Sequence, residues 1–149
     1  MTIELIAVVL CSIVIHEWAH AAVADREGDP TPRLLGRLTL HPAAHLDPIG
    51  SVAVPAVLSL TLGAAIGWCR PVPLTPARMR HGRRSLARTI AAGPAANLVL
   101  AGICGIVGYY PGASVNLALA AFNLIPIGSL DGGRLLRLAL TTDETKGEQ

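Results

Sequence analysis

Charged and aromatic residues are scarce in this chain of 149 residues. Asp, Glu, Lys and Arg together make up 15% of it, and Phe, Trp and Tyr only 3%. A water-soluble domain carries roughly 25% charged residues, so this chain has too little polar surface for a soluble fold. A disordered chain is also excluded, because 52% of the residues are hydrophobic and the mean hydropathy is +0.52. The length is that of a single domain.

Cysteine is rare as well, with one residue in each of three separate apolar runs. Cys11, Cys69 and Cys104 form no CxxC pair, and their number is odd. We therefore expect all three to be buried as small hydrophobic side chains.

The sequence does contain four apolar segments, at about residues 3–23, 49–69, 87–109 and 113–125. A helix needs about 20 residues to cross the hydrocarbon core, so the fourth segment is short. No Lys or Arg precedes the first segment and no small-residue cleavage site is evident, so we do not expect a cleaved signal peptide. The predicted fold is an all-α membrane protein with about three transmembrane helices plus a re-entrant or fourth hydrophobic segment.

Two polar connections, residues 24–48 and 70–86, hold most of the arginines. Within them, residues 34–40 and the proline-rich residues 70–76 favour short extended segments. The basic stretch from Arg78 to Arg88 has no interleaved aromatic residues, so we expect it to flank a membrane and not to bind nucleic acid. The positive-inside rule places both connections in the cytoplasm.

The pattern His16-Glu17-Trp18-Ala19-His20 is the most informative feature of the sequence. Two His residues at i and i+4 of a helix differ by about 40° in direction and about 6 Å along the axis, so both imidazoles point to one side. This geometry suits a zinc ion, and Glu17 can deprotonate a water beside it. Ionisable residues at the end of an apolar run are costly unless they have a function. We therefore predict that His16 and His20 bind Zn²⁺.

A catalytic zinc site needs a third protein ligand. The metzincin pattern is excluded, because Val23 and Arg26 stand where it requires Gly and His. Asp131 follows an apolar segment and a helix-breaking Pro126, which would let its carboxylate face a polar cavity, although an Asp before Gly-Gly is also typical of a turn. The residues alone leave five candidates open: Asp25, His41, His45, Asp47 and Asp131.

The order of these motifs resembles the site-2 protease family of intramembrane zinc metalloproteases. The resemblance rests on the HExxH segment at 16–20, on Gly93-Pro94-Ala95-Ala96-Asn97 opening a later helix, and on Asn123-x-x-Pro126 followed by Leu130-Asp131-Gly132-Gly133. Residues 36–42, 45–50 and 67–73 are similar to the small subgroup that lacks PDZ domains.

The resemblance assigns a role to each site residue. It implies that Asp131 is the third zinc ligand and that Glu17 is the general base. It also implies that Asn123 lies at the site, assisting the substrate or the oxyanion, and that Gly93, Pro94 and Asn97 pack their helix against the catalytic pair.

The function that follows is an intramembrane zinc endopeptidase that cuts in or near the transmembrane segments of substrate membrane proteins. We expect residues 1–149 to form one multi-pass domain of the cell membrane, in contact with the lipid bilayer. The alternative is a non-catalytic zinc-binding module that binds substrate helices. Glu17 favours the enzyme, whereas the short stretch 132–149, where relatives commonly carry another membrane helix, favours the alternative.

The motifs also predict the topology. His20 lies near the end of the first helix, Asp131 is expected to close the fourth, and Gly93 is expected to open the third, so these three points share one membrane side. Residues 24–88 must then leave from and return to that side, and the positive-inside rule makes it the cytoplasmic one. Since residues 49–69 have the length of one span only, we predict that they re-enter, turning near Pro55 or Gly63.

Overall fold

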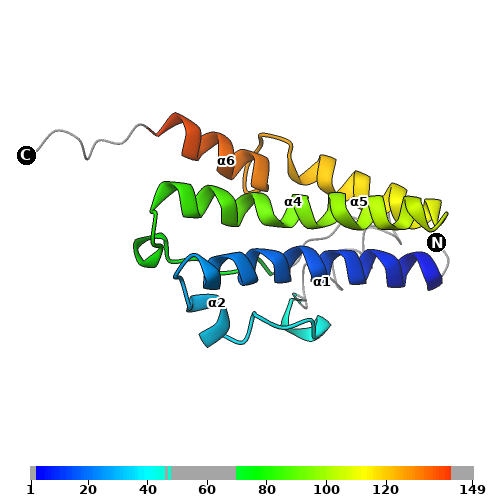
Figure 1. The fold of residues 1–149 in the computed structure, drawn as a ribbon, viewed down its shortest axis with the longest axis horizontal. Coiled ribbons are helices and arrows are strands. Elements are labelled where there is room, and N and C mark those ends of the chain that lie inside the picture. The colour runs from blue at the N-terminus through cyan, green and yellow to red at the C-terminus, as the bar shows by residue number, and fades with distance from the viewer. Residues whose placement is uncertain (1–2, 46, 48–69, 142–149) are drawn as a thin grey trace, which may run out of the picture.

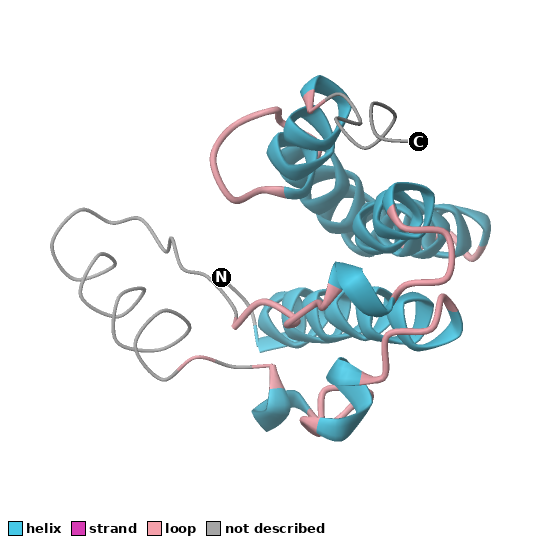
Figure 2. Cartoon of the chain, turned by 90° about the vertical axis from the view of Figure 1, so that its left-hand side faces the viewer, coloured by secondary structure: helices cyan, strands magenta, loops and turns pink. Residues whose placement is uncertain are grey.

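The computed structural model describes residues 3–45, 47 and 70–141, and all regular elements in these ranges are helices (Figure 1; Figure 2). The fold prediction of an all-α chain is confirmed for this part of the protein. The α-helices are α1 (Ile3–Arg26), α2 (Thr31–Leu34), α4 (Arg83–Ile106), α5 (Tyr110–Asn123) and α6 (Asp131–Leu140). Two 3₁₀ turns, η1 (Pro42–Ala44) and η3 (Pro76–Arg78), lie in the connections.

Helix α4 lies at the centre of the fold and packs against α1, α5 and α6. Figure 1 shows α1 and α4 side by side in opposite directions, with α5 running back along α4 and α6 continuing toward the end where α4 begins. The end of α1 and the start of α6 are thereby brought to the same region of α4.

Two of the described helices, α1 and α4, are long and apolar enough to cross a membrane. Each has 24 residues and is therefore about 36 Å long, more than the hydrocarbon core of about 30 Å. Helix α5 has 14 residues, or about 21 Å, which is short of a span. The third spanning helix that we predicted stays a prediction, and residues 49–69 lie outside the described residues.

The distribution of side chains is the reverse of that in a soluble protein. Large apolar residues such as Val99, Ile103 and Ile106 are 53–88% exposed on α4. Polar side chains lie inside instead: His16, His20, Ser85, Thr89, Asn97, Asn116 and Asp131 are all buried. Polar groups facing a bundle interior and apolar groups facing outward are what a lipid environment requires, so the fold is that of a membrane protein.

The cysteine prediction is wrong at Cys11, which is exposed, whereas Cys104 is partly buried. Cys69 lies outside the described residues. An apolar residue of a membrane helix can face lipid as readily as protein, so hydrophobicity alone does not indicate burial in the protein.

The end of α1 and the beginning of α4 lie side by side, as predicted. The backbone N–H of Arg80 donates to the Glu27 carbonyl at 2.8 Å, and Arg88 forms an ion pair with the Glu27 carboxylate at 3.1 Å. Glu27 at the end of α1 is therefore a neighbour of the residues that begin α4. The predicted re-entry within residues 49–69 stays a prediction.

Asp29, just after the end of α1, forms hydrogen bonds in both polar connections. Its carboxylate accepts hydrogen bonds from the backbone N–H of Thr31 at 3.0 Å and of Thr75 at 2.5 Å. Burial by itself would raise the pKa of Asp29, but these hydrogen bonds outweigh it and hold the pKa below its usual value. Asp29 is thus ionised at neutral pH.

Three local expectations differ from the structure. Residues 34–40 contain no strand, because α2 includes Leu34 and a turn follows at Gly36, whose φ of +68° favours glycine. Helix α4 begins at Arg83 and holds Pro94 in its interior, which membrane helices tolerate. Asp131 opens α6 and does not close the preceding helix.

Candidate metal centre

Two imidazoles of α1 and one carboxylate of α6 meet against α4. The Nε2 atoms of His16 and His20 are 3.1 Å apart, and Asp131 Oδ2 lies 3.2 Å from each of them. All three residues are buried, and no other group of three possible metal ligands was found among the described residues. The i, i+4 spacing thus brings the two imidazoles together as predicted, and the fold adds Asp131.

The spacing of these atoms fits Zn²⁺. Four-coordinate zinc binds His nitrogen and carboxylate oxygen at about 2.0–2.1 Å, so two ligand atoms of a tetrahedron are about 3.3 Å apart. The observed separations are 3.1 and 3.2 Å. In addition, Asp131 Oδ2 is buried and has no hydrogen-bond partner in the described structure. A cation would satisfy this oxygen.

The other nitrogen of each imidazole is held from α4. His20 Nδ1 donates to the Thr89 carbonyl at 2.7 Å, and His16 Nδ1 donates to Asn97 Oδ1 at 2.5 Å. A neutral imidazole protonated at Nδ1 has its lone pair at Nε2. Both lone pairs therefore face the same point, as metal ligands require.

Gly93 of α4 makes the close approach of the two imidazoles possible. A Cβ atom at this position would collide with His20 Nε2 and would lie only 2.5 Å from His16 Nε2. The packing of Gly93 and Asn97 against the pair, which the resemblance implied, is confirmed, although they act from the middle of α4 and not from its start.

We expect Gly93→Ala to abolish most zinc binding, because the added methyl group displaces both imidazoles. Gly102→Ala is the matched control, since a Cβ there meets nothing within 4 Å on the same helix. Alanine stabilises a helix relative to glycine by about 0.5–1 kcal/mol, so neither variant should unfold for reasons of propensity. Zinc content of the purified variants measures the effect, and equal zinc in both would contradict it.

Asp131 is positioned by the glycines that follow it. A Cβ atom at Gly132 would collide with the Leu124 carbonyl, and one at Gly133 would lie 2.7 Å from the Ile127 oxygen. The loop after α5 therefore lies directly on the first turn of α6, which directs Asp131 to the imidazoles. Its other oxygen, Oδ1, lies 3.6 Å from Arg134.

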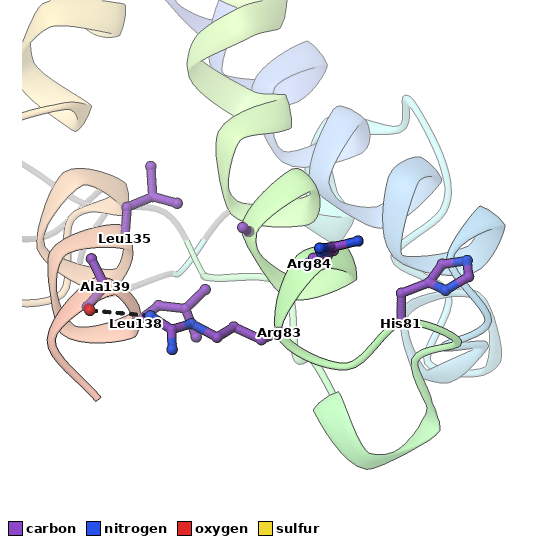
Figure 3. Close-up of a pocket in the computed structure, with 7 residues that line it drawn as sticks. His81, Arg83, Arg84, Leu135, Leu138 and Ala139 are labelled. Atoms are coloured by element: carbon purple, nitrogen blue, oxygen red, sulfur yellow. Dashed lines mark hydrogen bonds between the residues drawn. The ribbon is translucent and has the colours of Figure 1, made fainter. Parts of the chain in front are cut away.

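The far end of α6 is attached to the start of α4. The Arg83 guanidinium donates to the Ala139 carbonyl at 3.1 Å, the contact drawn in Figure 3. It also donates to the Thr141 carbonyl at 2.7 Å. A cation at the C-terminus of a helix is favourable.

A cavity of about 850 Å³ lies beside Arg83, and none of the three clustered residues lines it. Its lining is His81, Arg83, Arg84, Ala87, Leu135, Leu138 and Ala139.

The other candidates for the third ligand lie elsewhere. Asp25 forms an ion pair with Arg33 at 3.0 Å. His41 is exposed, and His45 is buried with its Nε2 donating to the Thr39 carbonyl at 2.7 Å. These three and Asp47 are not part of the cluster.

The two residues predicted to be catalytic lie near the cluster along the chain. Glu17 follows His16 on α1 and is half-buried. Asn123 is the last residue of α5, and its side-chain amide donates to the Leu119 carbonyl at 2.9 Å. Both roles stay predictions.

Thr89 and Asn116 contribute to the site and were missed from the sequence. Asn116 Oδ1 accepts a hydrogen bond from the Asn97 amide at 2.9 Å. A polar residue in the apolar segment 113–125 was the signal that could have found Asn116. Thr89 acts through its backbone carbonyl, which no side-chain pattern reveals.

Comparisons with known proteins identify one family and two similar proteins. Residues 109–148 match peptidase family M50. The chain is 34% identical to "Putative zinc metalloprotease YwhC" of Bacillus subtilis, over 89% of this chain and 67% of that protein. It is 35% identical to "Putative zinc metalloprotease Rip2" of Mycolicibacterium smegmatis, over 83% of this chain and 52% of that protein.

The chain thus spans about two-thirds of one relative and about half of the other. No solved structure gives a significant match. The matched family segment contains Asp131, and the two relatives match 89% and 83% of this chain. By this similarity the chain belongs to peptidase family M50, the site-2 protease family of zinc metalloproteases.

Proposed function

We propose that this chain is an intramembrane zinc endopeptidase that hydrolyses peptide bonds in or near the transmembrane segments of other membrane proteins. The observation that carries the proposal is the buried group of His16, His20 and Asp131, whose ligand atoms lie within 4.8 Å of one another. Its two His residues belong to α1 and face Gly93 of α4. These are the two described helices long enough to span a membrane. Peptide-bond chemistry would therefore take place inside the bundle.

His16, His20 and Asp131 are proposed to hold the zinc ion. Two His and one carboxylate would form a ligand set of the kind that catalytic zinc sites use. When bound, the ion would supply Lewis-acid chemistry, which activates water and polarises a scissile carbonyl. The hydrogen bonds from Nδ1 of each imidazole keep both Nε2 atoms directed at the ion.

Glu17 is proposed as the general base. It takes a proton from the attacking water and then donates that proton to the leaving amine. Asn123 is proposed to assist the substrate or the oxyanion. Among the described residues, one of its two amide protons is donated to the Leu119 carbonyl. The other is proposed to reach a carbonyl oxygen of the substrate.

The substrate is proposed to be a helix that unwinds before cleavage, because its carbonyls are otherwise bonded within the helix. We propose that the protein is multi-pass and that the site lies nearer the cytoplasm. Arg26 ends α1 six residues beyond His20, which is about 9 Å along the helix. The positive-inside rule places the arginine-rich connection after it in the cytoplasm.

Removal of the metal tests the proposal. The purified chain in detergent should contain zinc and cleave a labelled transmembrane peptide. A chelator should abolish cleavage, and added Zn²⁺ should restore it. Zinc binding without cleavage of any transmembrane peptide would favour the non-catalytic zinc-binding module instead.

A further inference from the structure

We propose that Asn116 of α5 is a positioning residue for His16, on which it acts through Asn97 of α4. The inference rests on the proposed zinc site. Three contacts form a chain that ends at the backbone: His16 Nδ1 to Asn97 Oδ1 at 2.5 Å, Asn97 Nδ2 to Asn116 Oδ1 at 2.9 Å, and Asn116 Nδ2 to the Gly112 carbonyl at 3.0 Å.

The direction of all three hydrogen bonds follows from the acceptor at the end of the series, the Gly112 carbonyl. The Gly112 carbonyl can only accept, so Asn116 turns its NH₂ group toward it and its oxygen toward Asn97. Asn97 then donates its own NH₂ to that oxygen, which leaves the Asn97 oxygen facing His16. Because an amide oxygen can only accept, Nδ1 of His16 must carry the proton.

This proton decides whether His16 can bind zinc. With Nδ1 protonated, the neutral ring presents its Nε2 lone pair to the cluster. The hydrogen bond to Asn116 Oδ1 is what fixes the orientation of the Asn97 amide. Without that acceptor, the amide is free to rotate. Rotated by half a turn, it would place NH₂ against Nδ1 and favour the ring protonated at Nε2, which cannot bind the metal.

His20 reaches the same tautomer by another route. Its Nδ1 donates to the backbone carbonyl of Thr89, an acceptor that no side-chain substitution removes. His16 depends instead on two amide side chains. A change at Asn116 should therefore weaken one of the two imidazole ligands and leave the other intact.

Burial makes this dependence strong. Asn97 is 0% exposed and Asn116 is 2% exposed, so water cannot readily replace a lost partner. The chain of hydrogen bonds also links three helices, α1, α4 and α5. Packing alone could therefore account for an effect of Asn116, and the experiment has to separate the two roles.

The first measurement compares zinc affinity with stability. The full chain in detergent is titrated with Zn²⁺ against a chromophoric chelator, and the Tm of the metal-free protein is recorded. Asn116→Leu keeps a similar volume and removes both polar atoms, so it should raise the zinc Kd about 10- to 100-fold, the range for partners of metal-bound His. Ala120→Gly, also buried and one turn later on α5, is the packing control and should leave the Kd unchanged.

The second measurement is a rescue at Asn97. A carboxylate accepts from His16 Nδ1 in either orientation, so after Asn97→Asp the ring no longer depends on Asn116. In that background, Asn116→Leu should not weaken zinc binding. A purely structural role of Asn116 would give the same loss in both backgrounds.

Each outcome decides the proposal. An equal loss of affinity in both backgrounds, or an equal loss from Ala120→Gly, would show that Asn116 acts only through packing. Zinc binding that Asp131→Ala abolishes but Asn116→Leu leaves unchanged would overturn the inference and keep the zinc site. A wild-type chain that binds no zinc would overturn both.

Discussion

Glu17→Gln should reduce cleavage of a transmembrane peptide by roughly 10²- to 10⁴-fold, the usual contribution of a general base. Gln keeps the size of the side chain but cannot accept the proton of the attacking water. Zinc should stay bound, because His16, His20 and Asp131 are unchanged. Initial cleavage rates and zinc content, measured on the same preparation, check both halves of this expectation.

The matched control is Glu4→Gln, the same substitution at an exposed position in the first turn of the same helix. It should leave both the rate and the zinc content unchanged. A Glu17→Gln variant with a rate within tenfold of wild type would show that another group is the base. Loss of zinc from this variant would instead indicate that Glu17 supports the ligands.

Asp131→Ala should release zinc and eliminate cleavage. It removes the only carboxylate of the cluster and leaves two imidazoles, which under-coordinate the ion. Changes to outer partners of metal ligands already cost 10- to 100-fold in affinity, so loss of a ligand should cost at least about 100-fold. The zinc Kd from chelator competition measures this effect.

Two other carboxylates provide the controls. Asp25→Ala removes an acidic group from the helix that carries both imidazoles, but one that pairs with Arg33. Asp47→Ala alters the polar connection. Both variants should retain zinc. Metal loss from Asp47→Ala with none from Asp131→Ala would show that the third ligand is wrongly assigned.

The sequence alone predicted the elements whose geometry is local. The apolar runs predicted α1 and α4, since a segment in lipid must satisfy its backbone hydrogen bonds within itself. The spacing of His16 and His20 predicted their convergence, because 3.6 residues per turn brings i and i+4 to one face of any helix. Neither conclusion depends on the rest of the fold.

The third member of the cluster depended on tertiary structure. From the residues alone, Asp131 was one of five candidates, and only the resemblance to a family singled it out. What brings it to the imidazoles is the close contact of Gly132 and Gly133 with the preceding loop and the packing of α6 on α4. Contacts between distant parts of the chain leave no periodic pattern in the sequence.

The environment of the imidazoles was decided in the same way. The resemblance singled out Gly93 and Asn97. It did not show that a Cβ at 93 would collide with the imidazoles or that Asn97 Oδ1 lies 2.5 Å from His16 Nδ1. The Thr89 acceptor is a backbone atom, which every residue possesses and only the fold can place beside His20. Helical periodicity thus determined which residues could bind a metal, whereas the packing of α1, α4, α5 and α6 decided which atoms meet and which nitrogen carries the proton.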